Sequence, residues 1–228
     1  MLFQKPSLRT RLSFEIGMTQ MGGHAVFYSV ADSPLGKKET IEDTAKVMSR
    51  YADIIMARLN TRSDLRQLAQ HSSVPVINAL DDYAHPCQVL ADFQTIIEQK
   101  GKLSGLNFSF IGDIQNNMTY DLMRGGILMG MNVKVAGPTG DSYAIEESVI
   151  EECKQLSSLS SSSGRFEVHS DAASAVKDCD IVYADTFQSY HLDEAQAEQR
   201  ELDLAPFQVN QEVFSQAAPD AIFMHCLP

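Results

Sequence analysis

The chain has 228 residues, and its 30 acidic and 18 basic side chains give a formal net charge of −12, which disfavours a surface that binds nucleic acid or anionic membranes. Its 44% hydrophobic and 21% charged content is typical of a globular protein and excludes general disorder. The four cysteines form no Cys-x-x-Cys pair, and no apolar run approaches the ~20 residues that span a bilayer. We therefore expect a cytoplasmic protein with no membrane segment.

The N-terminal part of the chain alternates helical patterns with short runs rich in β-branched and aromatic residues. Ser7 is expected to cap a helix that runs through Met21, and residues 37–51 show the spacing of a second helix with one apolar face. The short runs predict buried strands at residues 24–30, 53–59 and 74–80.

A long amphipathic helix is expected to begin near His85 and to stop at Gly101. Its apolar stripe comprises Val89, Leu90, Phe93, Ile96 and Ile97. Beyond it, strands are expected at residues 107–113, 132–138, 165–170, 180–185 and 221–228. Helices are expected between them, near residues 116–129, 141–156, 171–178 and 193–200. This β-α-β order predicts an α/β fold of two doubly wound parallel-sheet domains, residues 1–98 and 99–228, joined by the helix from His85.

The stretch KPSLRTR places cations and hydroxyls at the start of the first predicted helix. The free N–H groups and the dipole of a helix start favour an anion, and the guanidinium of Arg9 and the hydroxyls of Ser7 and Thr10 suit a phosphate group. A capped surface helix with solvated arginines is the alternative. Cations are electrostatically unfavourable at a helix start unless an anion is bound, so the stretch taken alone leaves both interpretations open.

The stretch HPCQ begins the long helix, because Pro86 suits the first helical turn. His85 and Gln88 then face the space beyond strand 74–80, where an imidazole and a carboxamide can hold a carbonyl and an amide. A helix cap next to an ordinary polar residue is the alternative. Four possible zinc ligands have spacings that match no usual pattern, so no metal is expected: His85, Cys87, His225 and Cys226.

Three more polar stretches follow strands of the second series. Residues 112–117, GDIQNN, lack the Gly-x-Gly-x-x-Gly fingerprint of dinucleotide sites, and Asn116 or Asn117 can cap the next helix. Asp185 ends a predicted strand, where its carboxylate can receive a cation. Cys226 ends the last one, and a buried, inert thiol is the alternative there.

Taken together and in order, these motifs resemble the aspartate/ornithine carbamoyltransferase family across essentially the whole chain. The motifs are S-x-R-T-R, H-P-x-Q, D-x-x-N-N, D-x-x-x-S and H-C-L-P. The last resembles the ornithine-using branch, because the aspartate-using relatives have a proline in place of the cysteine. The resemblance implies transfer of the carbamoyl group of carbamoyl phosphate to the side-chain amine of ornithine, giving citrulline and phosphate in arginine metabolism.

The resemblance also implies roles for the residues that match these motifs. The implied carbamoyl-phosphate site is made of Ser7, Leu8 through its N–H, Arg9, Thr10, Arg58, His85 and Gln88. The implied ornithine site is made of Asn117, Asp185, Ser189, Tyr190, Cys226 and Leu227. Arg58, His85 and Cys226 would be catalytic: the first two stabilise charge that grows on the carbonyl oxygen, and the thiol polarises the amine without acting as a nucleophile. No cofactor is implied.

Some features of the chain depart from the family pattern. Tyr190 and His191 stand where family members usually carry Met and Gly, so putrescine or an N-acylated ornithine are alternative acceptors. Pro34 replaces a polar residue of some members in a loop, 33–39, that resembles the one reaching into a neighbouring subunit. A non-catalytic carbamoyl-phosphate-binding relative is a further alternative.

The family forms trimers with shared active sites, so a homotrimer is implied. Family members also carry segments before K-P-S and after H-C-L-P. We therefore expect this chain, taken alone, to expose apolar surface and to be poorly folded or inactive.

Overall fold

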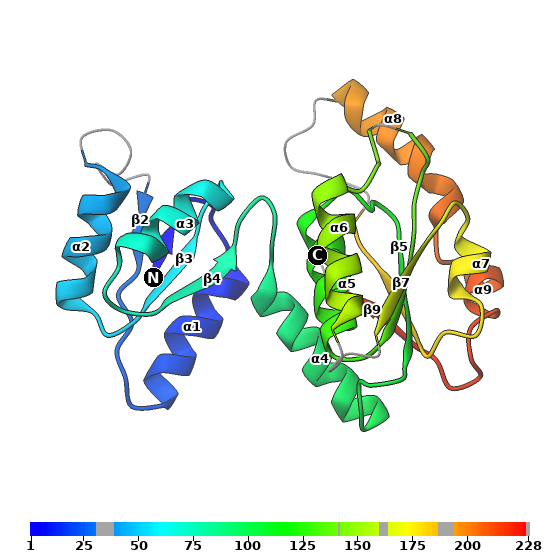
Figure 1. Cartoon of the computed structure of the whole chain (residues 1–228), viewed down its shortest axis with the longest axis horizontal. Helices are drawn as coiled ribbons and strands as arrows, with labels where there is room; N and C mark the ends of the chain where they lie inside the picture. The colour runs from blue at the N-terminus through cyan, green and yellow to red at the C-terminus, as the bar shows by residue number, and fades with distance from the viewer. Residues whose placement is uncertain (31–38, 141, 160–163, 187–193, 227–228) are drawn as a thin grey trace. The chain divides into compact units, whose positions relative to one another are not determined.

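The computed structural model describes residues 1–30, 39–140, 142–159, 164–186 and 194–226. The chain divides into two compact units, Met1–Cys87 and Gln88–Pro228. Each unit is built on a parallel sheet with connecting helices (Figure 1), so the predicted fold class of two parallel-sheet α/β domains is confirmed.

In the first unit the described strands form one sheet with the order β2-β1-β3-β4. The strands are β1 (Leu2–Phe3), β2 (Tyr28–Ser29), β3 (Ile55–Arg58) and β4 (Val76–Leu80). The helices are α1 (Leu8–Gln20), α2 (Ile41–Tyr51) and α3 (Arg62–His71). Buried aliphatic side chains from the strands and from α2 and α3 make a common core, which includes Leu2, Ile55 and Leu68.

The three helices of this unit begin in the same way. A hydroxyl side chain precedes each helix and accepts a hydrogen bond from the N–H three residues further on; these N-caps are Ser7, Thr40 and Thr61. Such a cap satisfies a donor that the helix leaves free and typically contributes ~1 kcal/mol. The cap at Ser7 confirms the predicted start of the first helix.

One strand prediction in this unit needs correction, and one strand was not predicted. Residues 24–30 do not form a buried strand: only Tyr28–Ser29 pairs, and Tyr28 is 39% exposed. Aromatic and β-branched content is shared by edge and inner strands, which is why the pattern misled. The strand between β2 and β3 is instead Leu2–Phe3, which is too short to leave a periodic pattern. Helix α3 was also missed, because Leu65 and Leu68 are its only buried residues.

The second unit has its described strands in the order β7-β6-β5-β8-β9. They are β5 (Asn107–Ile111), β6 (Asn132–Ala136), β7 (Arg165–His169), β8 (Ile181–Ala184) and β9 (Ile222–His225). The helices are α4 (Pro86–Lys100), α5 (Asn117–Leu128), α6 (Glu147–Ser158), α7 (Ala172–Val176), α8 (Glu194–Leu204) and α9 (Gln211–Phe214), with a 3-10 turn at Ala205–Phe207. Helices α5 and α6 lie on one side of the sheet and α7 and α9 on the other (Figure 1).

The order of this sheet changes direction at β5, which is flanked by β6 and β8. In open parallel sheets such a switch point is where ligands bind, beyond the carboxyl ends of the strands. The register aligns Ile111 with Ala184 and Ala184 with His225. The residues that follow these three therefore emerge together at the same edge, and they include Asp185 and Cys226.

Helix α4 confirms part of the predicted apolar stripe. It ends at Lys100, and Gly101 follows with a φ of 76°, the left-handed conformation expected of a helix C-cap. Phe93 and Ile96 are buried with Val89, but Leu90 and Ile97 are 64% and 47% exposed. Asp92 is buried on this helix although its side chain is ionisable. Hydrophobic periodicity does not predict that placement.

Candidate active site

The start of α1 combines a capping hydroxyl with free backbone N–H groups. The Oγ of Ser7 accepts from the N–H of Thr10 at 3.3 Å and donates to its Oγ1 at 3.0 Å. The first turn carries no acidic residue, so its N–H groups and dipole meet no neutralising carboxylate from that turn. Leu8 and Arg9 lie in the same turn with exposed side chains.

Arg58, the last residue of β3, extends the same region. Its Nη1 reaches the Oγ1 of Thr10 at 3.5 Å, a long contact, and its buried Nε has no hydrogen-bond partner among the described residues. Burial lowers the pKa of Arg58, and the positive charge of Arg9 lowers it further. Two guanidinium groups and a helix start thus share one region. An anion with several oxygen atoms would satisfy all three.

His85 lies at the end of a tight turn that connects β4 to α4. Asp81 makes the turn: its Oδ1 accepts from the N–H groups of Tyr83 and Ala84 at 2.8 and 2.7 Å, and its Oδ2 accepts from Asn78 at 3.1 Å. Burial lowers the pKa of His85 to about 4, and the charge of Arg58 adds to this. The imidazole is therefore neutral at pH 7. The role of Asp81 was missed, although an Asp two residues before a turn amide is a known signature.

In the second unit, Asp185 and Cys226 meet at the switch point. The Sγ of Cys226 donates to Oδ1 of Asp185 at 3.0 Å. Burial, together with the negative charge of Asp185, raises the pKa of the thiol to about 12. The thiol therefore stays protonated at neutral pH and is a donor rather than a thiolate nucleophile.

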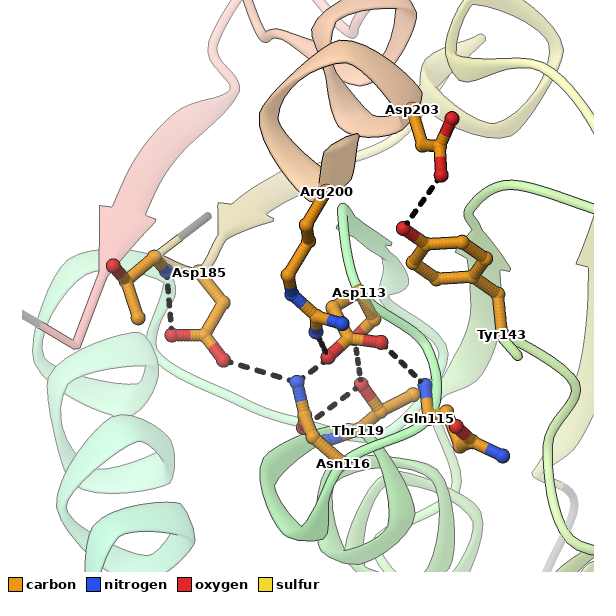
Figure 2. Close-up of polar contacts among 9 residues, drawn as sticks. Asp113, Gln115, Asn116, Thr119, Tyr143, Asp185, Arg200 and Asp203 are labelled. Carbon is orange, nitrogen blue, oxygen red and sulfur yellow. Dashed lines mark hydrogen bonds and ion pairs between the residues drawn. The ribbon is translucent and has the colours of Figure 1, made fainter. Parts of the chain in front are cut away.

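The carboxylate of Asp185 is held from two more directions, as Figure 2 shows. The Nδ2 of Asn116 donates to its Oδ2 at 3.2 Å, and the N–H of Thr186 donates to its Oδ1 at 2.7 Å. Asn116 is also the N-cap of α5, because its Oδ1 accepts from the N–H of Thr119. The side-chain amide of Asn116 thus fixes both the start of α5 and the carboxylate of Asp185. Asn117, the predicted substrate ligand, is the first residue of that helix.

A second layer of polar contacts supports this edge from α8 (Figure 2). Arg200 forms an ion pair with the buried carboxylate of Asp113, which lies in the turn after β5. Three residues further along α8, Asp203 accepts from the hydroxyl of Tyr143 at 3.0 Å. Sequence reasoning missed these contacts, because residues in α8 are remote in sequence from those they bind.

Gln88 belongs to a third group of hydrogen-bonded side chains in the second unit. Its Nε2 donates to Oδ1 of Asp92, one turn along α4, at 3.0 Å, and Oδ2 of Asp92 accepts from the hydroxyl of Tyr183 at 3.2 Å. Burial raises the pKa of Asp92 to about 6, while both hydrogen bonds act in the opposite direction. Asp92 and Tyr183 were not predicted as site residues. The available signal was an acidic residue on the apolar stripe of α4, four positions after Gln88.

The structure brings together some predicted site residues within each unit and leaves others undescribed. The first unit holds Ser7, Leu8, Arg9, Thr10, Arg58 and His85, and the second holds Gln88, Asn117, Asp185 and Cys226. Ser189, Tyr190, Leu227 and the loop residue Pro34 lie outside the described residues. Among the described residues, no three His, Cys, Asp or Glu side chains gather as metal ligands, and no helix is long and apolar enough to cross a membrane.

Comparison with known proteins gives consistent matches over both units. Residues 1–98 match the family model "Aspartate/ornithine carbamoyltransferase, carbamoyl-P binding domain", and residues 104–228 match "Aspartate/ornithine carbamoyltransferase, Asp/Orn binding domain". The ornithine carbamoyltransferase of Thermococcus kodakarensis is 49% identical over 228 residues, which are all of this chain and 70% of that protein. A relative from Pyrococcus furiosus, named as the anabolic enzyme, is 47% identical with the same coverage.

Solved structures agree with these relatives. The ornithine carbamoyltransferase of Pyrococcus furiosus matches with a TM-score of 0.92 and 46% identity, and the enzyme from Giardia lamblia with 0.87 and 39%. Each match covers the whole of this chain and 71% of the other.

Proposed function

Because the chain belongs to the aspartate/ornithine carbamoyltransferase family, we propose that it transfers the carbamoyl group of carbamoyl phosphate to the side-chain amine of L-ornithine. The products are citrulline and phosphate. The observation that carries the choice of ornithine is the pair formed by Cys226 and Asp185, a protonated thiol on a carboxylate at the switch point. A carboxylate there suits the cationic end of a diamino acid.

The first unit supplies the groups that the donor substrate needs. Ser7, Arg9 and the N–H groups of the α1 start would bind the phosphate. Arg58 and the neutral His85 would donate to the carbonyl oxygen, where negative charge grows as the amine attacks. In acyl-transfer sites one such donor is typically worth ~3–4 kcal/mol of transition-state stabilisation. The like charges of Arg9 and Arg58 support this assignment, because a dianion relieves their repulsion.

The reaction needs no covalent intermediate on the protein. The side-chain amine of ornithine reacts in its neutral form: its nitrogen bonds to the carbonyl carbon, the bond from that carbon to the phosphate oxygen breaks, and the nitrogen loses one proton. Cys226 cannot be the base, because its thiol is already protonated. We assign the proton to the departing phosphate, and we assign Cys226 and Asp185 to the orientation of the amine. Asn117, Ser189, Tyr190 and Leu227 complete the proposed ornithine site.

Three finer assignments belong to the same proposal. We propose a cytoplasmic homotrimer that shares its active sites and serves arginine metabolism. The support is the family resemblance together with the name of the Pyrococcus furiosus relative, which is anabolic. We also propose domain limits of 1–98 and 99–228, close to the ranges that the two family models match.

The acceptor is tested by comparing L-ornithine, putrescine and N-acetyl-L-ornithine at equal concentrations with carbamoyl phosphate. We expect kcat/KM for ornithine to exceed that for each of the others by at least about 100-fold, because an analogue that lacks or blocks a bound polar group leaves buried partners unpaired. Chromatography of the ureido products measures this, and a reaction without protein corrects for spontaneous carbamoylation. Faster turnover of putrescine or N-acetylornithine would replace ornithine as the substrate. Binding without turnover of any amine would indicate a non-catalytic relative.

A further inference from the structure

The side-chain amide of Gln88 is held in one orientation. An ionised carboxylate has only acceptors, so the end of the amide that contacts Oδ1 of Asp92 must be the nitrogen. The carbonyl oxygen of Gln88 is then directed away from Asp92, and it makes no hydrogen bond to the described residues.

We propose that Asp92 is a positioning residue that fixes the amide of Gln88 with its carbonyl oxygen toward the amino group of the carbamoyl donor. Tyr183 holds Asp92 in place. The consequence is selectivity for a carbamoyl group over an acyl group of the same shape that has no N–H. This inference rests on the proposed function, because it concerns the same donor substrate.

The pair formed by Asp92 and Tyr183 is rigid enough for this task. Asp92 is 5% exposed and Tyr183 is fully buried. The ring of Tyr183 packs against the rings of Phe108 and Phe110, with centroid distances of 5.9 and 5.8 Å, so its hydroxyl cannot move without repacking the core. The negative charge of Asp185 also acts on Asp92 and raises its pKa. Near pH 8 Asp92 is ionised and accepts both hydrogen bonds.

A fixed carbonyl oxygen discriminates between an amino group and a methyl group. The amino group of a carbamoyl compound donates to it, whereas a methyl group of the same size leaves the oxygen without a partner. Removing one partner of a buried hydrogen bond is more costly than the bond is favourable, because the remaining group has lost its hydration. If the amide of Gln88 could rotate, its nitrogen could face the ligand instead, and this discrimination would fall.

The test compares two stable phosphonates that differ only at this group. Phosphonoacetamide carries the amino group, and acetonylphosphonate carries a methyl group in its place. Calorimetry at pH 8 gives the ratio of their dissociation constants for the wild type and for Asp92→Asn. The asparagine has the same shape but can turn either an oxygen or a nitrogen to Gln88. We expect the preference for phosphonoacetamide to fall about tenfold, mainly through weaker binding of phosphonoacetamide.

A matched control lies on the same helix. Gln94 donates to Glu98 at 3.1 Å with the same spacing of four residues, but on the exposed face. We expect Glu98→Gln to leave the ratio unchanged. Tyr183→Phe keeps the ring and removes only the hydroxyl, and we expect a smaller fall of about threefold. Tyr183→Phe also tests the proposal if Asp92→Asn does not fold.

The outcomes separate this inference from the proposed function. An unchanged ratio in both variants overturns the inference while leaving the carbamoyl-phosphate site intact. Equal weakening of both phosphonates also overturns it, because that shows a structural role only. Failure of the folded wild type to bind either phosphonate overturns the proposed function itself.

Discussion

Replacing Arg58 by Met is expected to lower kcat/KM by about 10³ while the protein remains folded. Arg58 would contact both the phosphate and the carbonyl oxygen of the donor, and loss of one donor to the developing oxyanion typically costs 10²–10³ in rate. A hydrogen bond to a charged group is worth ~1.5–3 kcal/mol, so we expect the dissociation constant of phosphonoacetamide to rise by roughly 10- to 100-fold. Calorimetry and initial rates measure the two effects.

The thermal stability of the ligand-free Arg58→Met variant should not fall with its activity. Burial and the charge of Arg9 lower the pKa of Arg58, so its charged form is disfavoured in the ligand-free folded protein. Removing that charge should leave the melting temperature unchanged or raise it slightly, and should reduce the stabilisation that we expect carbamoyl phosphate to give to the wild type. Arg66→Met is the control, because Arg66 is an exposed arginine on α3. A folded Arg58→Met variant that binds phosphonoacetamide like the wild type would contradict the assignment.

Replacing Asp185 by Asn is expected to reduce kcat/KM for ornithine by about 10³ and to leave the affinity for phosphonoacetamide within about twofold. The carboxylate organises the thiol of Cys226 and the amide of Asn116, and it would orient the cationic end of the acceptor. A charged hydrogen-bond partner that is removed from a partly buried site leaves its neighbours unsatisfied, which explains the size of the effect. Initial rates at varied ornithine and calorimetry with the phosphonate give both numbers.

The same variant makes a second, independent prediction about Cys226. Asp185 raises the pKa of that thiol, which is about 12 in the folded protein, so removing the negative charge should lower it toward the ordinary value. Each unit by which the pKa falls increases the thiolate fraction at pH 8 about tenfold. Alkylation of Cys226 by iodoacetamide, followed by mass spectrometry, should therefore become faster. The exposed Glu212→Gln on α9 should alter neither rate. An unchanged alkylation rate in Asp185→Asn would contradict the electrostatic account.

The sequence predicts those elements of the fold whose residue types and periodicity indicate the same structure. The cap at Ser7 and the strands on either side of α5 follow from local patterns, because N-caps and buried parallel strands have strong residue preferences. The edge that joins Asp185 to Cys226 could also be predicted, since the carboxyl ends of parallel strands emerge together.

The parts that were missed depend on contacts distant in sequence. The ion pair between Arg200 and Asp113 joins residues 87 positions apart, and the bond between Tyr183 and Asp92 joins residues 91 apart. Neither leaves a local pattern, since a charged side chain in a helix is usually solvated. The stripe on α4 failed for a related reason. Periodicity places Leu90 and Ile97 on an apolar face, but the packing of the whole unit decided that they are exposed and that Asp92 is buried.

The most direct test of the account follows a labelled carbamoyl group from donor to acceptor. The chain is incubated with ¹³C-carbamoyl phosphate and L-ornithine, as it stands and in a version extended by the segments that the family carries beyond both ends. NMR follows the label, and a colorimetric assay follows phosphate. After subtraction of a reaction without protein, we predict labelled citrulline and phosphate in equal amounts from the extended version, and little from that version carrying Arg58→Met. Phosphate release without labelled citrulline, from a protein that binds phosphonoacetamide, would contradict it.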